Sequence, residues 1–123
     1  MTKAINILKK QVLHDAQHIP DFIDNKSETM KIIWDHIKFI FQNIQRLITD
    51  DFLSKQKLTN IARKVLESIM SLLNYSGTTL YQVVILPYLL QRLDTYKMLA
   101  EQEELYESLS NLIEFEKLFT IDE

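Results

Sequence analysis

The chain has 123 residues, a formal net charge of −3, 46% hydrophobic residues and 25% charged residues. This length and composition predict a single globular domain with its own core. They exclude an intrinsically disordered chain, which has few apolar residues and a high net charge. Because the chain has no Cys, a disulfide scaffold, a thiolate metal site and a cysteine nucleophile are also excluded. One Gly and two Pro are too few for a fold rich in tight turns, so we expect an all-α protein of long helices.

The first predicted helix covers residues 2–18. Apolar side chains at spacings of three and four share one face of it: Ile5, Leu8, Val12 and Ala16. Pro20 ends this helix, because the residue before a proline is pushed out of the α region. In the connection that follows, we expect Phe22 and Ile23 to fold back onto the bundle.

The second predicted helix, residues 30–48, has an apolar face too broad for a single partner helix to cover. Its central stripe has alternating spacings of four and three: Ile33, Ile37, Ile40, Ile44 and Leu47. Ser27 is its predicted N-cap. Trp34 and Phe41 widen the stripe, and Phe39 lies off it. We therefore predict that Trp34, Phe39 and Phe41 belong to a surface left over for a protein partner.

The third predicted helix begins at Phe52 or Lys55 and ends at Asn74, again with apolar side chains three and four residues apart. Gly77, the only glycine, follows just past this end, where a left-handed C-terminal cap is expected. Residues 79–82 (Thr-Leu-Tyr-Gln) form a capping box, which predicts the start of a fourth helix.

The fourth predicted helix extends to Leu99 and differs from the others, because residues 83–90 are apolar on all sides. Such a surface is typical of a helix that is buried on most sides, so we expect this helix at the centre of the bundle. Pro87 is predicted to kink the helix or to break it after Leu86. The apolar run is far shorter than the roughly 20 residues that span a bilayer, and no signal peptide is recognised, which predicts a cytoplasmic protein.

The last predicted helix, residues 101–119, is acidic. The first 100 residues carry a net charge of +4 and the last 23 a net charge of −7, which together give the −3 of the whole chain. Glu103, Glu104 and Glu107 are candidate contacts for a basic protein partner. The alternative is that they form a solvated face beside basic neighbours. The five segments together predict an antiparallel bundle of four to five helices.

His14 and His18 lie four residues apart on one helical face, a spacing at which two imidazoles can share a metal ion. Their spacing alone resembles the His-Glu-x-x-His motif of zinc proteases, because Asp15 stands where that motif has its general-base glutamate. The alternative is an exposed pair whose partial positive charge suits the end of the helix dipole. We predict no cofactor and no catalytic residue, and we keep His14 and His18 as candidates for a metal site.

The sequence lacks the motifs of several large enzyme classes. It has no Gly-rich phosphate loop, no nucleophile elbow and no Glu-x-x-His pair. Its basic residues are scattered, so no nucleic-acid partner is predicted. The preferred hypothesis is a cytoplasmic, non-enzymatic module for protein binding or regulation, with another protein or a second copy as its partner. Small helical bundles include bacteriocin-immunity proteins, secretion chaperones and phage-encoded inhibitors, which is an analogy of fold alone.

Two other hypotheses stay open. A ligand-sensing or carrier bundle would hold an apolar pocket beside the fourth helix, bordered by Tyr81, Leu86 and Tyr88. A metal-dependent enzyme would be centred on His14 and His18.

Overall fold

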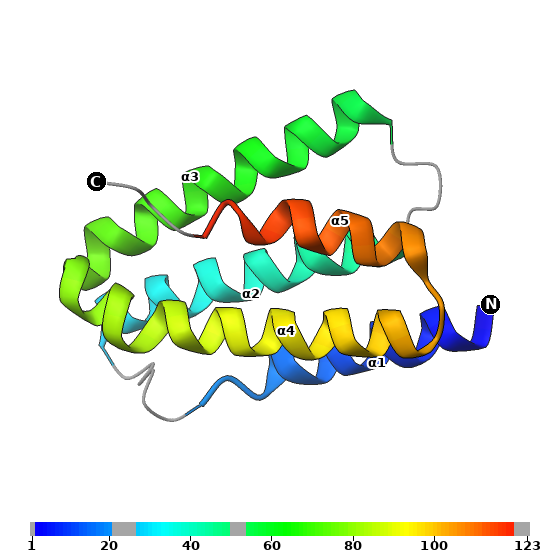
Figure 1. Cartoon of the computed structure of the whole chain (residues 1–123). Coiled ribbons are helices and arrows are strands. Elements are labelled where there is room, and N and C mark those ends of the chain that lie inside the picture. Colours follow the sequence, from blue (N-terminus) through cyan, green and yellow to red (C-terminus); the bar gives the residue numbers. More distant parts are fainter. Residues whose placement is uncertain (1, 21–26, 50–53, 120–123) are drawn as a thin grey trace.

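The computed structural model describes residues 2–20, 27–49 and 54–119, which form a bundle of antiparallel helices (Figure 1). The elements in chain order are α1 (Thr2–Gln17), α2 (Glu28–Thr49), α3 (Lys55–Leu80), the π-helix η1 (Tyr81–Ile85), α4 (Leu86–Gln102) and α5 (Tyr106–Glu116). No strand occurs within these described ranges, which confirms the all-α prediction. The prediction for Phe22 and Ile23 lies outside the described residues.

The centre of the bundle is α2, which packs against α1, α3 and α5. Its predicted apolar stripe is confirmed as core, because each of its residues is at most 2% exposed: Ile33, Ile37, Ile40, Ile44 and Leu47. Phe41 and Ile48 beside the stripe are equally buried. The broad apolar face of α2 is therefore covered within the chain, since three helices surround it.

The prediction that the fourth helix forms the centre is wrong. One side of η1 and α4 is buried, at the four positions Tyr81, Ile85, Leu89 and Leu93. The other side is at the surface, where Val83 is 68% exposed. In a regular α-helix, residues four apart are displaced by about 40° around the axis, so a series at this spacing gradually leaves one side. Between Tyr81 and Ile85 the wider π-helical turn displaces the residues in the opposite sense, which keeps the four positions on one side. The helices α1, α3 and α5 pack against only one side of η1 and α4. Residues 83–90 are therefore buried on one side only, although their sequence is apolar throughout.

Two serines begin the central helices as N-caps. The Ser27 hydroxyl accepts a hydrogen bond from the Met30 N–H at 3.1 Å, which confirms the predicted cap of α2. The Ser54 hydroxyl accepts one from the Lys57 N–H at 3.2 Å, so the third helix begins at Lys55, one of the two predicted positions. Each cap satisfies a backbone donor that has no partner inside its helix.

Gly77 interrupts α3 with φ 81° and ψ 158°. The positive φ confirms the predicted break, although the extended ψ is not that of a left-handed helical cap. Helical hydrogen bonding resumes at once, because the Tyr81 N–H donates to the carbonyls of Gly77 and Thr78. Two helices therefore meet at Gly77, and the residues of the predicted capping box, 79–82, lie at the start of the second one.

The turn between α4 and α5 lies at Glu103 and Glu104, so the predicted start of the last helix at residue 101 is wrong. Glu104 has φ 59°, and the Leu105 N–H donates to the Ala100 carbonyl at 2.8 Å, which closes the end of α4.

Pro87 lies in the first turn of α4, directly after η1, and a kink at this proline stays a prediction. Among the described residues, no helix has both the length and the apolar content that a membrane span requires.

Candidate functional site

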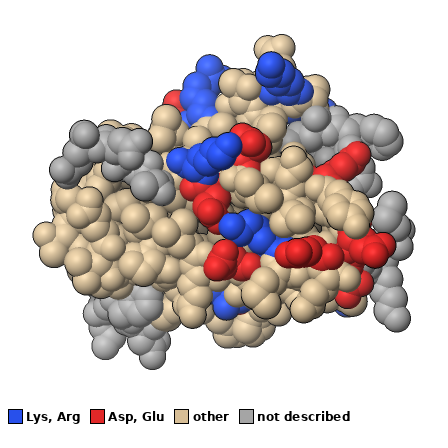
Figure 2. All heavy atoms as spheres, in the orientation of Figure 1, with Lys and Arg blue, Asp and Glu red and all other residues tan. Residues whose placement is uncertain are grey.

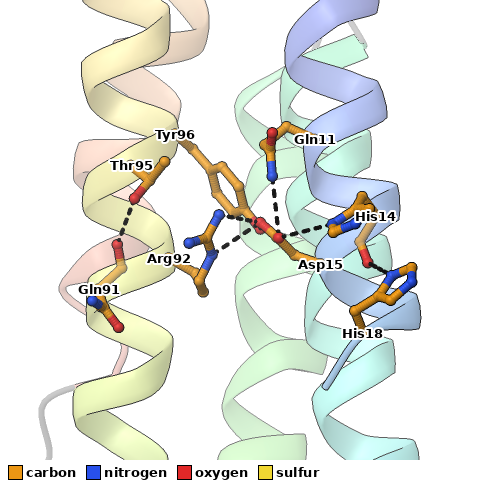
Figure 3. Close-up of polar contacts among 8 residues, drawn as sticks. All are labelled: Gln11, His14, Asp15, His18, Gln91, Arg92, Thr95 and Tyr96. Atoms are coloured by element: carbon orange, nitrogen blue, oxygen red, sulfur yellow. Dashed lines mark hydrogen bonds and ion pairs between the residues drawn. The ribbon is translucent and has the colours of Figure 1, made fainter. Parts of the chain in front are cut away.

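Asp15 forms a buried polar joint between α1 and α4 (Figure 3). The residue is only 8% exposed. Its Oδ2 accepts hydrogen bonds from Arg92 Nε at 2.9 Å, Arg92 Nη2 at 2.6 Å and Tyr96 Oη at 2.6 Å. Its Oδ1 accepts a hydrogen bond from Gln11 Nε2 at 3.2 Å. Four donated hydrogen bonds compensate much of the cost of removing this carboxylate from water.

Helical spacing brings these groups together. Asp15 follows the buried Val12 by three residues, so it lies on the apolar face of α1. Arg92 and Tyr96 lie four residues apart, so both side chains project from one face of α4 toward Asp15. In the described part of the chain, no buried side-chain nitrogen or oxygen lacks a hydrogen-bond partner. The joint is therefore closed and satisfied within the chain.

Burial and charge set the protonation states of this joint. Burial, and then the hydrogen bond to Asp15, raises the pKa of Tyr96 far above that of a free tyrosine. Burial also raises the pKa of the neighbouring Tyr88 to about 12, and the charge of Asp15 acts in the same direction. Burial lowers the pKa of Arg92, but its hydrogen bonds and charge pairing with Asp15 outweigh this effect and raise it. Tyr96 and Arg92 thus keep their protons at neutral pH, which suits a structural tie and does not suit a general base.

The structure brings His14 and His18 together, but no third metal ligand joins them among the described residues. Their rings stack with centroids 4.0 Å apart and 14° between planes. His18 Nδ1 lies 2.7 Å from the His14 carbonyl oxygen, and His14 Nδ1 lies 3.6 Å from Asp15 Oδ1. His36 lies elsewhere, on α2, with its ring stacked on Tyr75 at 6.3 Å. Across the described ranges, no group of three or more His, Cys, Asp or Glu residues is placed to hold a metal ion.

Of the three aromatic residues predicted to meet a partner, Phe41 is a correction. It is 1% exposed and meets the rings of Tyr88 and Tyr96 edge-on at 6.3 and 6.4 Å. A side chain enclosed in this way cannot contact another protein. Trp34 and Phe39 are half-buried, and the Lys38 ammonium lies 4.3 Å from the centre of the Trp34 ring.

The acidic candidates Glu103, Glu104 and Glu107 are exposed at the turn between α4 and α5. Figure 2 shows acidic side chains toward the right, where Figure 1 places this turn. Lys97 on α4 forms an ion pair with Glu116 on α5, which joins the two helices farther from the turn. The structure thus places these three glutamates together, on one end of the bundle.

An apolar groove separates α3 from α5. Both helices pack on α2, but they do not pack closely on each other. The groove holds about 250 Å³ and is lined by Leu58, Thr59, Ala62, Glu114, Phe115 and Leu118. Two polar residues hold α5 on α2: Ser108 Oγ donates to the Ile48 carbonyl and Asn111 Nδ2 to the Leu47 carbonyl, both at 3.3 Å. The small side chain of Ala62 leaves the α3 wall shallow, so the groove stays open.

A second hollow of about 220 Å³ lies between α1 and α2, lined by apolar and amide side chains together with Lys38. Neither of these two hollows borders η1 or α4, where an apolar pocket was predicted. No family model, curated protein or solved structure matches this chain.

Sequence reasoning missed both the Asp15 joint and the groove. A signal for the joint was present, because Asp15 continues the apolar face of Leu8 and Val12. Its partner Arg92 lies 77 positions away in the chain, so the pairing itself has no local signature. The groove depends on which helices fail to pack, and helical periodicity does not report that.

Proposed function

We propose that this chain is a non-enzymatic, cytoplasmic module for protein binding or regulation, and that its α3–α5 groove receives an amphipathic helix of a partner protein. The groove itself carries the proposal. The hollow between α3 and α5 is open and lined mainly by apolar side chains, and grooves of this kind take up the apolar face of a helix. The apolar lining consists of Phe115, which is buried, and of Leu58, Ala62 and Leu118, which are half-buried.

The α5 wall indicates the charge of the partner. Glu114 lines the groove, and Glu107 lies two helical turns earlier on the same edge of α5 and is exposed. Glu103 and Glu104 extend this negative charge past the start of the helix. We therefore propose a partner helix with Leu or similar side chains on its inner face and Lys or Arg along the edge beside α5.

The remaining polar groups give no comparable support to an enzyme. Asp15, Arg92 and Tyr96 satisfy one another inside the bundle. The His14–His18 pair has no third ligand among the described residues. The carrier hypothesis also receives no support from the two hollows, since both lie away from α4.

A defined peptide tests this proposal. The probe is a helix of about 18 residues with Leu on one face and Lys along one edge, and its control has Glu in place of each Lys. We expect the Lys peptide to bind and to shift the NMR signals of Leu58, Ala62 and Leu118. We expect the Glu peptide to bind at least about tenfold more weakly, because it meets the acidic edge of α5.

A matched pair of tryptophan variants tests whether the peptide binds in the α3–α5 groove. Ala62→Trp fills the groove and is expected to abolish binding of the Lys peptide. Ile113→Trp puts the same side chain on a part of α5 that is 44% exposed and turned away from the groove, and it is expected to leave binding unchanged. The proposal fails if neither peptide binds at millimolar concentration, or if both variants bind alike.

A further inference from the structure

The chain has a long stretch without charge that reaches the surface. No Lys, Arg, Asp, Glu or His occurs between Glu67 and Arg92, although a quarter of the whole chain is charged. Figure 2 shows the result as an area free of acidic and basic side chains toward the left, over η1 and the start of α4. We name this area the charge-free face. It consists of six exposed or half-buried residues: Thr79, Gln82, Val83, Leu86, Pro87 and Leu90.

This face is largely apolar, and the part of the chain that the structure describes leaves it exposed. Val83 is 68% exposed, Pro87 is exposed, and Leu86 and Leu90 are half-buried. The opposite side of the same helical stretch, which includes Tyr81, is buried against the bundle. A helix that is apolar on both sides is typical of positions where both sides are covered. The described residues cover the inner side and leave the outer side exposed.

We propose that the charge-free face is the contact between two copies of this chain, related by a twofold axis. In such a contact each copy presents the same patch, so a charge close to the twofold axis would lie near its own duplicate. A patch without charges avoids that repulsion and avoids burying unpaired ions. The absence of charge from this exposed surface thus suits a twofold contact.

The charge distribution of the whole molecule favours the same occupant. The acidic turn with Glu103, Glu104 and Glu107 lies at the other end of α4 (Figure 1). Two copies that meet through the charge-free face keep these acidic ends far apart, where solvent screens them. Contact through the acidic end would instead bring like charges together.

Other occupants fit less well. Nucleic acids and charged peptides need charged groups to bind, and the charge-free face has none. A helix that lies on a membrane surface carries Lys and Arg along its polar side. Here Glu67 precedes the charge-free stretch, and Arg92, which follows it, is held by Asp15. A second copy of the chain is therefore the partner that this chemistry selects.

Sedimentation velocity over a range of protein concentrations tests the proposal, with two lysine variants. We expect the unaltered chain to shift from monomer to dimer as concentration rises. Val83→Lys is expected to weaken the dimer at least about tenfold, because it puts like charges near the twofold axis. Met98→Lys makes the same change at a residue that is 60% exposed farther along α4, and it is expected to leave the dimer intact. Circular dichroism verifies that both variants fold.

Cross-linking gives a second readout, because the chain has no Cys of its own. Under mild oxidation, Val83→Cys is expected to form covalent dimers much faster than Met98→Cys. A chain that stays monomeric at millimolar concentration overturns the proposal, and so do variants that sediment and cross-link alike. Binding of the monomer to phosphatidylcholine vesicles that Val83→Lys abolishes would also overturn it, in favour of a lipid surface. The face excludes the α3–α5 groove, so loss of the dimer leaves peptide binding unchanged.

Discussion

The chain contains two strongly apolar helical stretches, α2 and η1 with the first turns of α4, and the structure treats them differently. The apolar face of α2 is enclosed by three helices, and its stripe residues are at most 2% exposed. The second stretch buries only one side, at Tyr81, Ile85, Leu89 and Leu93, while Val83 opposite is 68% exposed. The more continuously apolar sequence is thus the less covered of the two.

This difference shows that the burial of an apolar helix face depends on the helices packed beside it and not on its own sequence alone. The broad apolar face of α2 is buried against α1, α3 and α5, so Phe41 belongs to the core and not to an interface. Within the described ranges, the outer side of η1 and the start of α4 is exposed and packs against no other helix. Apolar area without cover in the monomer is where a contact between molecules is expected.

The largest expected effect contrasts one residue from each stretch. Ile37→Ala removes a fully buried side chain from α2 and should lower the free energy of unfolding by about 2–5 kcal/mol. Val83→Ala, the matched control, should change it by less than about 0.5 kcal/mol, because the side chain is exposed. Urea unfolding of both variants at a concentration where the chain is monomeric measures the contrast. Equal losses would mean that the two stretches are covered alike.

Asp15→Asn tests the joint that ties α4 to α1. The change leaves Arg92 without its counter-charge in a partly buried site and weakens the acceptor for Tyr96, so a loss of about 2 kcal/mol in unfolding free energy is expected. Asp94→Asn, the control, removes a carboxylate that is 73% exposed and pairs with Lys97, and should cost at most about 0.5 kcal/mol. If urea unfolding finds the two variants equally stable, the joint is not what holds α4 on α1.

Gly77→Ala tests the break that lets η1 fold back along the bundle. A methyl group at this position would meet nothing within 4 Å, so the cost comes from the backbone alone. Residues with a side chain rarely adopt φ 81° with ψ 158°, and we expect a loss of about 1–3 kcal/mol in unfolding free energy. A thermal melt that matches the unaltered chain would show that Gly77 does not need this conformation.

Alkaline pH tests how firmly η1 is held. Burial raises the pKa of Tyr81 to about 12, and its hydroxyl donates to the Phe119 carbonyl at 2.9 Å. The folded chain therefore keeps this proton between pH 10 and 12 while the unfolded chain loses it, so stability is intact below pH 10 and falls as pH rises above it. Tyr81→Phe removes this contribution, and its unfolding free energy should fall less steeply from pH 9 to 11. Identical slopes would place the Tyr81 hydroxyl in water.

The parts of the fold that could be predicted from sequence are those with local causes. The stripe of α2, the cap at Ser27 and the break at Gly77 each follow from a few neighbouring residues, and all three are confirmed. The turn at Glu104 was missed because a glutamate with positive φ has no compositional signature. The Asp15–Arg92 joint and the α3–α5 groove depend on contacts between distant segments, which no local pattern records.

Thiol labelling tests the contrast between the two stretches most directly. The chain has no Cys, so Ile37→Cys and Val83→Cys each report one position. In dilute protein, Val83→Cys should react with a thiol reagent as fast as a free thiol, while Ile37→Cys should react only when the chain unfolds. As protein concentration rises, the rate for Val83→Cys should fall, because a second copy covers the charge-free face. A fast rate at Ile37→Cys, or a rate at Val83→Cys that does not depend on concentration, would contradict this account.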